Sequence, residues 1–96
     1  MSHNPKKWLF EKPKDFKEQV LDLPQSVRPK LTEVMTLLSE SDNPLSIGEK
    51  KTTKYGEFYT IRLNDRYRLA FDIPDPTNKK IRIIRTGGHN FTYGKK

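Results

Sequence analysis

The sequence contains no cysteine among its 96 residues. No disulfide can therefore stabilise the fold, and no thiolate is available to bind a metal ion or attack a substrate. Long apolar runs are also missing. The N-terminal region offers only Trp8-Leu9-Phe10, which predicts neither a signal peptide nor a membrane span. We therefore expect a cytoplasmic protein that makes no membrane contact.

Apolar residues are scarce as well, at 32% of the chain. A soluble domain usually has about 45–50%, counting glycine, so the core must be small. A chain of this length forms one domain and buries only about 60–65% of its unfolded surface. We expect a flexible N-terminal end over residues 1–7 and a single domain over 8–96.

The second half of the chain has few acidic residues. Residues 1–48 carry seven basic and seven acidic side chains, whereas residues 49–96 carry twelve basic and five acidic ones. The whole net charge of +7 therefore resides in the second half. Such asymmetry is typical of a protein with an anionic partner, nucleic acid first among them. A basic surface that only keeps the protein soluble explains it equally well.

The first half of the sequence predicts a short strand and two helices. Residues 8–11 favour the strand, and the helical spacing of apolar residues favours a first helix over 14–23. A second helix is expected to begin near Arg28, because Pro29 is tolerated in a first turn, and to end before Asn43-Pro44. Its apolar stripe is core packing and consists of Leu31, Val34, Met35 and Leu38.

The second half changes to the two-residue period of half-buried strands. Alternation over 59–63 and 67–73 predicts two antiparallel strands, and 81–86 predicts a third. Together these patterns predict an α+β fold. It consists of a short N-terminal strand and two helices packed on one face of a small antiparallel sheet, whose other face stays polar.

The register of the expected hairpin places two arginines together. A loop of three residues, 64–66, pairs Leu63 with Tyr67 so that the apolar sides of both strands agree. The same register sets Arg62 opposite Arg68, and like charges facing each other across strands are destabilising. An anion bound between them would relieve the repulsion, and phosphate suits the guanidinium group. The alternative is that both side chains extend into water.

No metal or cofactor is expected. A zinc site needs three or four ligands, and without cysteine the two histidines, His3 and His89, do not supply them. Two-metal phosphodiester chemistry needs converging carboxylates. The second half has only five scattered ones: Glu49, Glu57, Asp65, Asp72 and Asp75.

One histidine is placed for chemistry. His89 follows Gly87-Gly88 after the last expected strand, where glycines allow the backbone to turn sharply and approach a ligand closely. A histidine there can act as a general acid or base, although a plain surface position is the commoner case. Phe91 and Tyr93 either stack on bases or close the edge of the core. The lysines of the loop expected before the second strand either follow a phosphate backbone or are simply solvated: Lys50, Lys51 and Lys54.

Two segments resemble the RelE/ParE toxin superfamily. They are residues 57–71, with the sequence EFYTIRLNDRYRLAF, and 83–89, with the sequence IIRTGGH, followed by the aromatic Tyr93. The layout matches from about Trp8 onward, and the ending resembles the YafQ-type branch. The resemblance implies an enzyme of the mRNA interferase class, a ribosome-dependent endoribonuclease that cuts mRNA in the A site, beside 16S rRNA. The 2′-hydroxyl attacks the adjacent phosphate without a metal ion, and an acidic antitoxin neutralises the toxin.

The resemblance also implies roles for individual residues. Arg68 would stabilise the transition state, His89 would be the general acid, Tyr93 would orient the substrate, and Glu49 matches the general base of the YoeB-type branch. The candidate RNA-binding residues are Arg62, Lys50, Lys51, Lys54, Arg85 and Arg82.

The sequence also departs from the pattern. Thr60 stands where RelE has lysine, and His89 stands where many relatives have arginine, which leaves the division of acid and base roles open. Two other functions remain as alternatives: a ParE-like gyrase inhibitor without catalysis, and an RNA-binding module that does not cleave.

Overall fold

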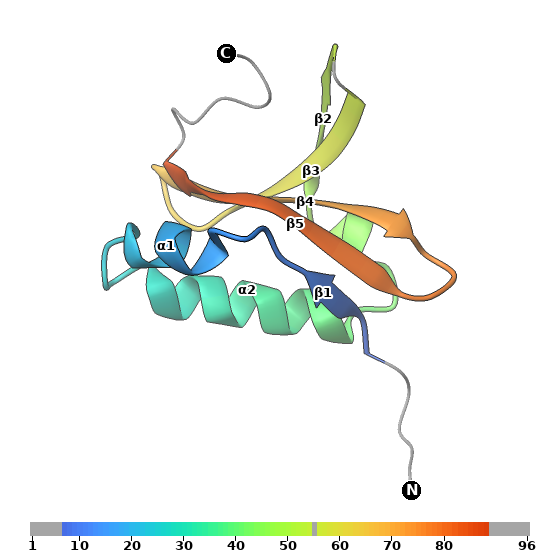
Figure 1. The fold of residues 1–96 in the computed structure, drawn as a ribbon, viewed down its shortest axis with the longest axis horizontal. Coiled ribbons are helices and arrows are strands. Elements are labelled where there is room, and N and C mark those ends of the chain that lie inside the picture. Colours follow the sequence, from blue (N-terminus) through green and yellow to red (C-terminus); the bar gives the residue numbers. More distant parts are fainter. Residues whose placement is uncertain (1–6, 55, 89–96) are drawn as a thin grey trace, which may run out of the picture.

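A five-stranded sheet packed on two helices forms the fold. The computed structural model describes residues 7–54 and 56–88. Figure 1 shows both helices on one side of the sheet. Along the chain the elements are β1 (Leu9–Glu11), α1 (Phe16–Leu21), α2 (Arg28–Glu40), η1 (Pro44–Ser46, a 3-10 turn), β2 (Glu49–Thr53), β3 (Gly56–Arg62), β4 (Tyr67–Asp75) and β5 (Lys80–Gly88).

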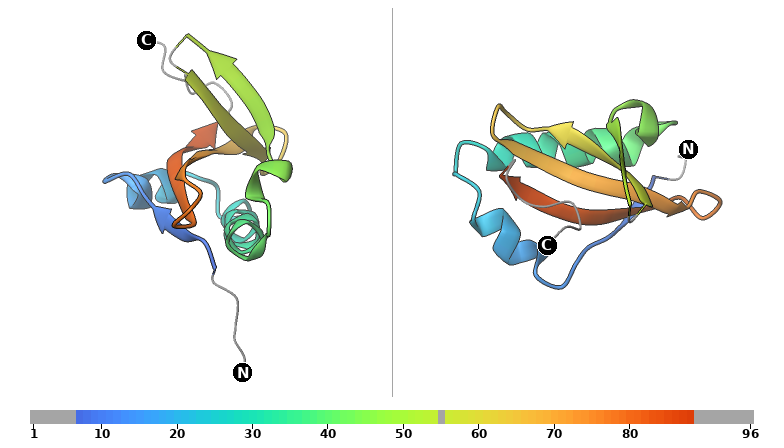
Figure 2. Two further views of the ribbon diagram at one scale, coloured as in Figure 1. Left: turned by 90° about the vertical axis from the view of Figure 1, so that its right-hand side faces the viewer. Right: turned by 90° about the horizontal axis from the view of Figure 1, so that it is seen from above.

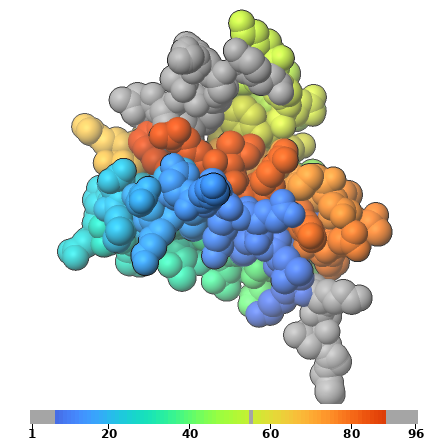
Figure 3. Space-filling view, viewed as in Figure 1, coloured from blue at the N-terminus to red at the C-terminus, as the bar shows by residue number. Residues whose placement is uncertain are grey.

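The order of the strands makes the sheet mixed rather than wholly antiparallel. The strands lie in the order β1-β5-β4-β3-β2, and only β1 pairs in parallel, with β5. The first strand thus lies beside the last, as the contact between their blue and orange surfaces shows (Figure 3). The predicted hairpin strands are antiparallel as expected, and the pairing of the short N-terminal strand was not predicted. The chain runs from β1 through two helices to β2 and then through successive antiparallel strands to β5, which leaves β1 and β5 running in the same direction. The short sequence of β1 gives no signal of its direction.

The two helices confirm the predicted pattern with one change of length. Helix α2 begins at Arg28, with a proline in its first turn. Three residues of its predicted stripe, Leu31, Val34 and Leu38, are buried. Helix α1 has six residues, shorter than the expected 14–23. It ends at Leu21, and Pro24 follows too closely for the helix to continue, because proline disfavours helical backbone at the residue before it.

Sequence analysis missed β2, which occupies the segment expected to be a loop. Its sequence, EKKTT, has no apolar residue, so no hydrophobic alternation reveals it. It is held by backbone pairing with β3, from Glu49 opposite Thr60 to Thr53 opposite Gly56. A short, charged edge strand of this kind also discourages pairing with other chains. The β2–β3 hairpin rises steeply from the rest of the sheet (Figure 2).

The core lies between the helices and one face of β3, β4 and β5. Leu69 and Phe71 of β4 and Ile81 of β5 are fully buried there. The N-terminal strand is fixed to the other layer through Trp8, whose indole Nε1 donates a hydrogen bond of 2.8 Å to the carbonyl of Ser41. The core is small, as the composition predicts. Its connected cluster of buried residues lies on the helix side of the sheet, whereas Phe58 and Ala70 are buried on the other side.

Two bulges interrupt the β4–β5 ladder. Ala70 pairs with Arg85 but Phe71 pairs with Ile83, so Ile84 is an extra residue. A second shift falls between Asp72 and Asp75. Bulges change the side on which following side chains emerge. The first bulge therefore allows Ile83 to face the core while Arg85 faces away from it.

Candidate functional site

The helix-free face of the sheet gathers most of the charged candidates. We define this face as the residues that the cross-strand pairs place on the same side of the sheet as Arg68. The core residues Leu69 and Phe71 of β4 lie on the opposite side. The helix-free face carries Glu49, Lys51, Phe58, Thr60, Arg62, Arg68, Ala70, Asp72, Arg82 and Arg85.

The predicted arginine pair is confirmed. Arg62 and Arg68 are direct cross-strand partners, and the loop 64–66 joins their strands. The backbone N–H of Leu63 donates to the carbonyl of Tyr67 at 2.8 Å. Alternation along the ladder then makes Arg62–Arg68 a non-hydrogen-bonded pair, the position at which facing side chains lie closest. The repulsion expected from the sequence is therefore built into the hairpin.

One guanidinium nitrogen of this pair is buried and unsatisfied. Nη1 of Arg68 has no hydrogen-bond partner within the described part of the chain, and the Arg68 residue as a whole is half-buried. A buried N–H without an acceptor is costly, and more so when it carries charge. An anionic oxygen placed between Arg62 and Arg68 would satisfy this donor and offset the like-charge repulsion.

Arg82 has a partner of its own. Its Nε and Nη2 donate to the two carboxylate oxygens of Asp72 at 3.0 and 2.6 Å. The hydrogen bond to this carboxylate, together with its charge, raises the pKa of Arg82. Of the predicted RNA-binding arginines, Arg82 is thus already neutralised by a bidentate contact, the strongest ion-pair geometry for a guanidinium.

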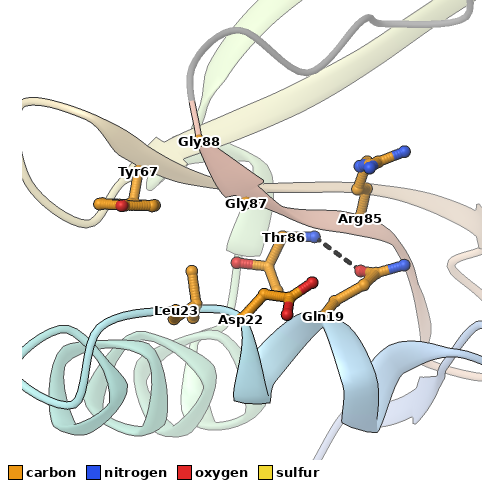
Figure 4. A pocket seen from close by; sticks show the side chains of 8 residues that line it. All are labelled: Gln19, Asp22, Leu23, Tyr67, Arg85, Thr86, Gly87 and Gly88. Atoms are coloured by element: carbon orange, nitrogen blue, oxygen red, sulfur yellow. Dashed lines mark hydrogen bonds between the residues drawn. The ribbon is translucent and has the colours of Figure 1, made fainter.

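Arg85 also belongs to the helix-free face. It pairs with Ala70 across the bulge, and its side chain is directed away from α1 (Figure 4). Ala70 is fully buried and has a short side chain, so it separates Arg85 from the strand of Arg62 without adding charge. The arginines of three strands therefore lie on one surface.

The candidates on β2 divide between its two sides. Glu49 lies opposite Thr60 on the helix-free face, and its carboxylate is 3.4 Å from Nζ of Lys51. Lys50 alternates to the other side, where its Nζ lies 3.4 Å from the carboxylate of Glu57. Lys50 and Lys51 were expected in a loop but belong to a strand, so they point in opposite directions and cannot follow one backbone together. Lys54 lies in the turn after β2.

Two predicted site residues lie outside the described residues. They are the candidate acid His89 and the aromatic Tyr93. The last described residue, Gly88, ends β5 next to the strand of the arginine pair, because it is the partner of Tyr67.

A small hollow lies on the other side of the same strand ends. It has a volume of about 230 Å³ and is lined by α1 and by the ends of β4 and β5, including Gln19, Asp22, Tyr67 and Thr86. There the backbone N–H of Thr86 donates to Oε1 of Gln19 at 3.0 Å (Figure 4). Sequence reasoning missed these residues, since a polar side chain on a short helix gives no signal of a partner 67 positions away.

Two further features concern what the described residues do not contain. Within residues 7–54 and 56–88, no three His, Asp or Glu side chains gather as metal ligands would. No helix in these same ranges has the length and hydropathy to span a membrane.

Comparison with solved structures identifies the fold. A RelE–RelB complex from the archaeon Pyrococcus horikoshii OT3 superposes with a TM-score of 0.66 at 18% identity, covering 88% of this chain and 98% of that one. The fold is that of the RelE toxins. An E. coli RelE mutant in the free state gives a TM-score of 0.62 at 18% identity, covering 84% of this chain and 82% of that one.

A third structure with the RelE fold comes from another toxin–antitoxin complex. The RelBE2 complex of Mycobacterium tuberculosis gives a TM-score of 0.58 at 18% identity, covering 85% of this chain and 98% of that one. No protein-family model and no curated protein matches the sequence. The likeness is therefore one of architecture: the RelE fold, with its N-terminal strand, two helices and sheet, is shared at low sequence identity.

Proposed function

We propose that this protein is the toxin of a type II toxin–antitoxin pair and inhibits translation as a metal-independent, ribosome-dependent endoribonuclease. The observation that carries the proposal is the Arg62–Arg68 pair on the helix-free face of a RelE fold, in which Nη1 of Arg68 is buried and has no hydrogen-bond partner in residues 7–54 and 56–88. Such a pair is unfavourable alone and favourable around a phosphate. The scissile phosphate of mRNA is the anion that the proposal places there.

The chemistry is an internal transfer at phosphorus. The 2′-hydroxyl oxygen bonds to the adjacent phosphorus while its proton passes to a base. The bond from phosphorus to the 5′-oxygen breaks, and that oxygen receives a proton. The products are a 2′,3′-cyclic phosphate and a free 5′-hydroxyl. Extra negative charge develops on the phosphoryl oxygens in between, and fixed guanidinium groups stabilise it without needing to reorganise.

Arg68 is the best-placed group for that role, because the residue is half-buried and its buried Nη1 has no hydrogen-bond partner among the described residues. Arg62, on the exposed side of the pair, would bind the phosphate. Glu49 is proposed as the base that takes the 2′-proton, from the same face. His89 as the acid and Tyr93 as the substrate-orienting aromatic remain proposals from the sequence alone.

The surrounding cations would hold the flanking RNA. Arg85 and Lys51 lie on the helix-free face and would contribute most to this binding. Lys50, on the opposite side, and Arg82, in its ion pair, would contribute less. An acidic antitoxin that covers this face is the proposed partner, since two of the solved RelE structures are complexes with RelB. The toxin would act on ribosomes in the cytoplasm.

Primer extension on one defined mRNA tests the proposal. Purified protein is added to programmed ribosomes and, separately, to naked RNA with magnesium or with EDTA. We expect cuts at A-site codons with ribosomes only. The new 5′ ends should accept phosphate from polynucleotide kinase directly, since they carry a hydroxyl, whereas a metal-dependent nuclease usually leaves a 5′-phosphate.

Two variants make the assay specific. Arg68→Ala should slow cleavage by about 10²–10³-fold, the usual loss when one transition-state donor is removed. Arg66→Ala is the matched control, because Arg66 is an exposed arginine of the β3–β4 loop. Equal activity in both variants would contradict the proposed site. Ribosome binding without any cut would favour an RNA-binding module, and inhibition of DNA supercoiling without a cut would favour a gyrase inhibitor.

A further inference from the structure

A buried threonine on the helix side of the sheet contacts the backbone of Arg68. The hydroxyl of Thr86 donates a hydrogen bond of 2.9 Å to the backbone carbonyl of Arg68. Thr86 is 2% exposed, and its direct cross-strand partner is Leu69, the residue after Arg68. The hydroxyl therefore holds the peptide group that joins Arg68 to the core residue Leu69.

The threonine is itself held by a helix. Its backbone N–H donates to Oε1 of Gln19 on α1 at 3.0 Å, and Nε2 of Gln19 donates to Oδ1 of Asp15 at 2.9 Å. Figure 4 shows the Gln19 side chain reaching from α1 toward β5. Asp15, Gln19, Thr86 and the backbone of Arg68 thus form one continuous chain of hydrogen bonds from the helix layer to the sheet.

Arg68 is paired with β3 on one side and with β5 on the other, but two features near it leave the β5 side open to small adjustments. The bulge at Ile84 breaks the regular register two residues from Arg68. Within the described residues, β5 continues beyond Thr86 as Gly87 and Gly88, which pair with Arg68 and Tyr67 and belong to the residue type with the widest conformational freedom. A small rotation of the backbone at Arg68 would move the guanidinium, at the end of a long side chain, by a larger distance.

We propose that Thr86, held in place by Gln19, is a positioning residue that fixes the guanidinium of Arg68 on the opposite face of the sheet. Its catalytic consequence rests on the proposed function, whereas its effect on the order of the Arg68 side chain does not. Neither residue contacts the substrate, because both lie on the helix side of the sheet.

The test compares Thr86→Val, which keeps the shape but removes the hydroxyl, with Thr86→Ser, which keeps the hydroxyl. In ribosome-dependent cleavage we expect Thr86→Val to lower kcat by about tenfold, with KM changed by less than about twofold, since misplacing a catalytic group costs rate rather than binding. Thr86→Ser should recover most of the rate. Gln19→Leu should show a smaller loss of kcat. Thr52→Val, at an exposed threonine of β2, should change nothing.

A second readout needs neither cleavage nor a ligand. ¹⁵N relaxation of the Arg68 Nε–H reports the order of its guanidinium in the free protein. We expect faster and larger motion in Thr86→Val and native-like order in Thr86→Ser and Thr52→Val. If wild-type protein does not cleave, the proposed function fails and this readout alone decides the positioning role.

Two outcomes would overturn the inference. One is an Arg68 resonance in Thr86→Val that relaxes as in wild-type protein. The other is an equal loss of rate in Thr86→Val and Thr86→Ser that follows their loss of thermal stability, because a purely structural threonine would behave in that way.

Discussion

The two faces of β4 differ in almost every physical property although they alternate along one strand. Leu69 and Phe71 face the helices and are fully buried in the core. Arg68 and Asp72 face the other way and are only half-buried. The first set stabilises the fold, and the second places charge on the face on which the proposed function rests. We therefore expect substitutions on the two faces to separate stability from the proposed function.

A second difference lies within the helix-free face. Asp72 and Arg82 form a complementary cross-strand pair with two hydrogen bonds, whereas Arg62 and Arg68 repel each other. The complementary pair is complete without a ligand. The like-charged pair is incomplete, which is why the proposed function assigns the phosphate to it.

The largest expected effect comes from the core face. Phe71→Ala should lower the free energy of unfolding by about 3–5 kcal/mol, because a fully buried ring leaves a cavity that rigid neighbours cannot fill. Urea unfolding measures the loss. Phe71→Leu serves as the milder variant if the alanine variant does not fold. A loss below about 1 kcal/mol in the alanine variant would place Phe71 outside the core's main contacts.

The next effect compares the two arginine environments. Arg62→Gln should slow ribosome-dependent cleavage by about 30–100-fold, because it removes one cation from the phosphate. Arg82→Gln should change the rate by less than about threefold, since Asp72 already occupies that guanidinium. Cleavage rates at saturating ribosome concentration distinguish them. Equal losses would mean that the Asp72 contact opens when RNA binds.

A glycine beside the core offers a sharper measure of packing on the helix side. A Cβ at Gly48 would lie 3.0 Å from Cε1 of Phe71 and 3.2 Å from Cβ of Tyr59. Because the Phe71 ring is fully buried, it cannot move aside, and Gly48→Ala should cost about 1–2 kcal/mol of stability. Chemical denaturation measures it. The cost should shrink in a Phe71→Leu background, and an unchanged cost would assign the strain to Tyr59.

The smallest expected effect is a substitution that stabilises the protein, whereas most substitutions destabilise it. In low-salt buffer without phosphate, Arg62→Gln should raise the free energy of unfolding by about 0.3–0.5 kcal/mol, because it removes a facing like charge. Added phosphate should stabilise the wild-type protein more than the variant. Thermal unfolding in chloride and in phosphate at equal ionic strength measures both, since screening alone acts equally in the two buffers. Destabilisation by Arg62→Gln would show that the pair does not repel in the free protein.

The sequence predicted those parts of the molecule that alternation specifies. The stripe of α2 and the Leu63–Tyr67 register followed from apolar periodicity, and the register alone was enough to place Arg62 opposite Arg68. Periodicity could not reveal β2, whose pairing depends on backbone hydrogen bonds at a charged edge. Periodicity also could not predict the extra residue Ile84, because a bulge changes the side on which the following side chains emerge without changing the composition.

The candidate site was predictable only in its centre. The arginine pair came from register, but the pairing of Arg82 with Asp72 and the support of Thr86 by Gln19 depend on side-chain directions set by two layers of structure. The lysines of β2 show the same limit. The sequence left open whether these lysines follow a phosphate backbone together or are simply solvated, and a strand sends Lys50 and Lys51 to opposite sides.

The position of β5 in the sheet has a consequence for the order of events during synthesis. This strand is made last of the five, yet it lies between β1 and β4 and contributes fully buried side chains to the core. A nascent chain that has not yet produced β5 has no partner for β1, no cover for α1 and no support for the carbonyl of Arg68. Because domains fold as units during translation, the chain completes the sheet that carries its arginine surface only after β5 has emerged.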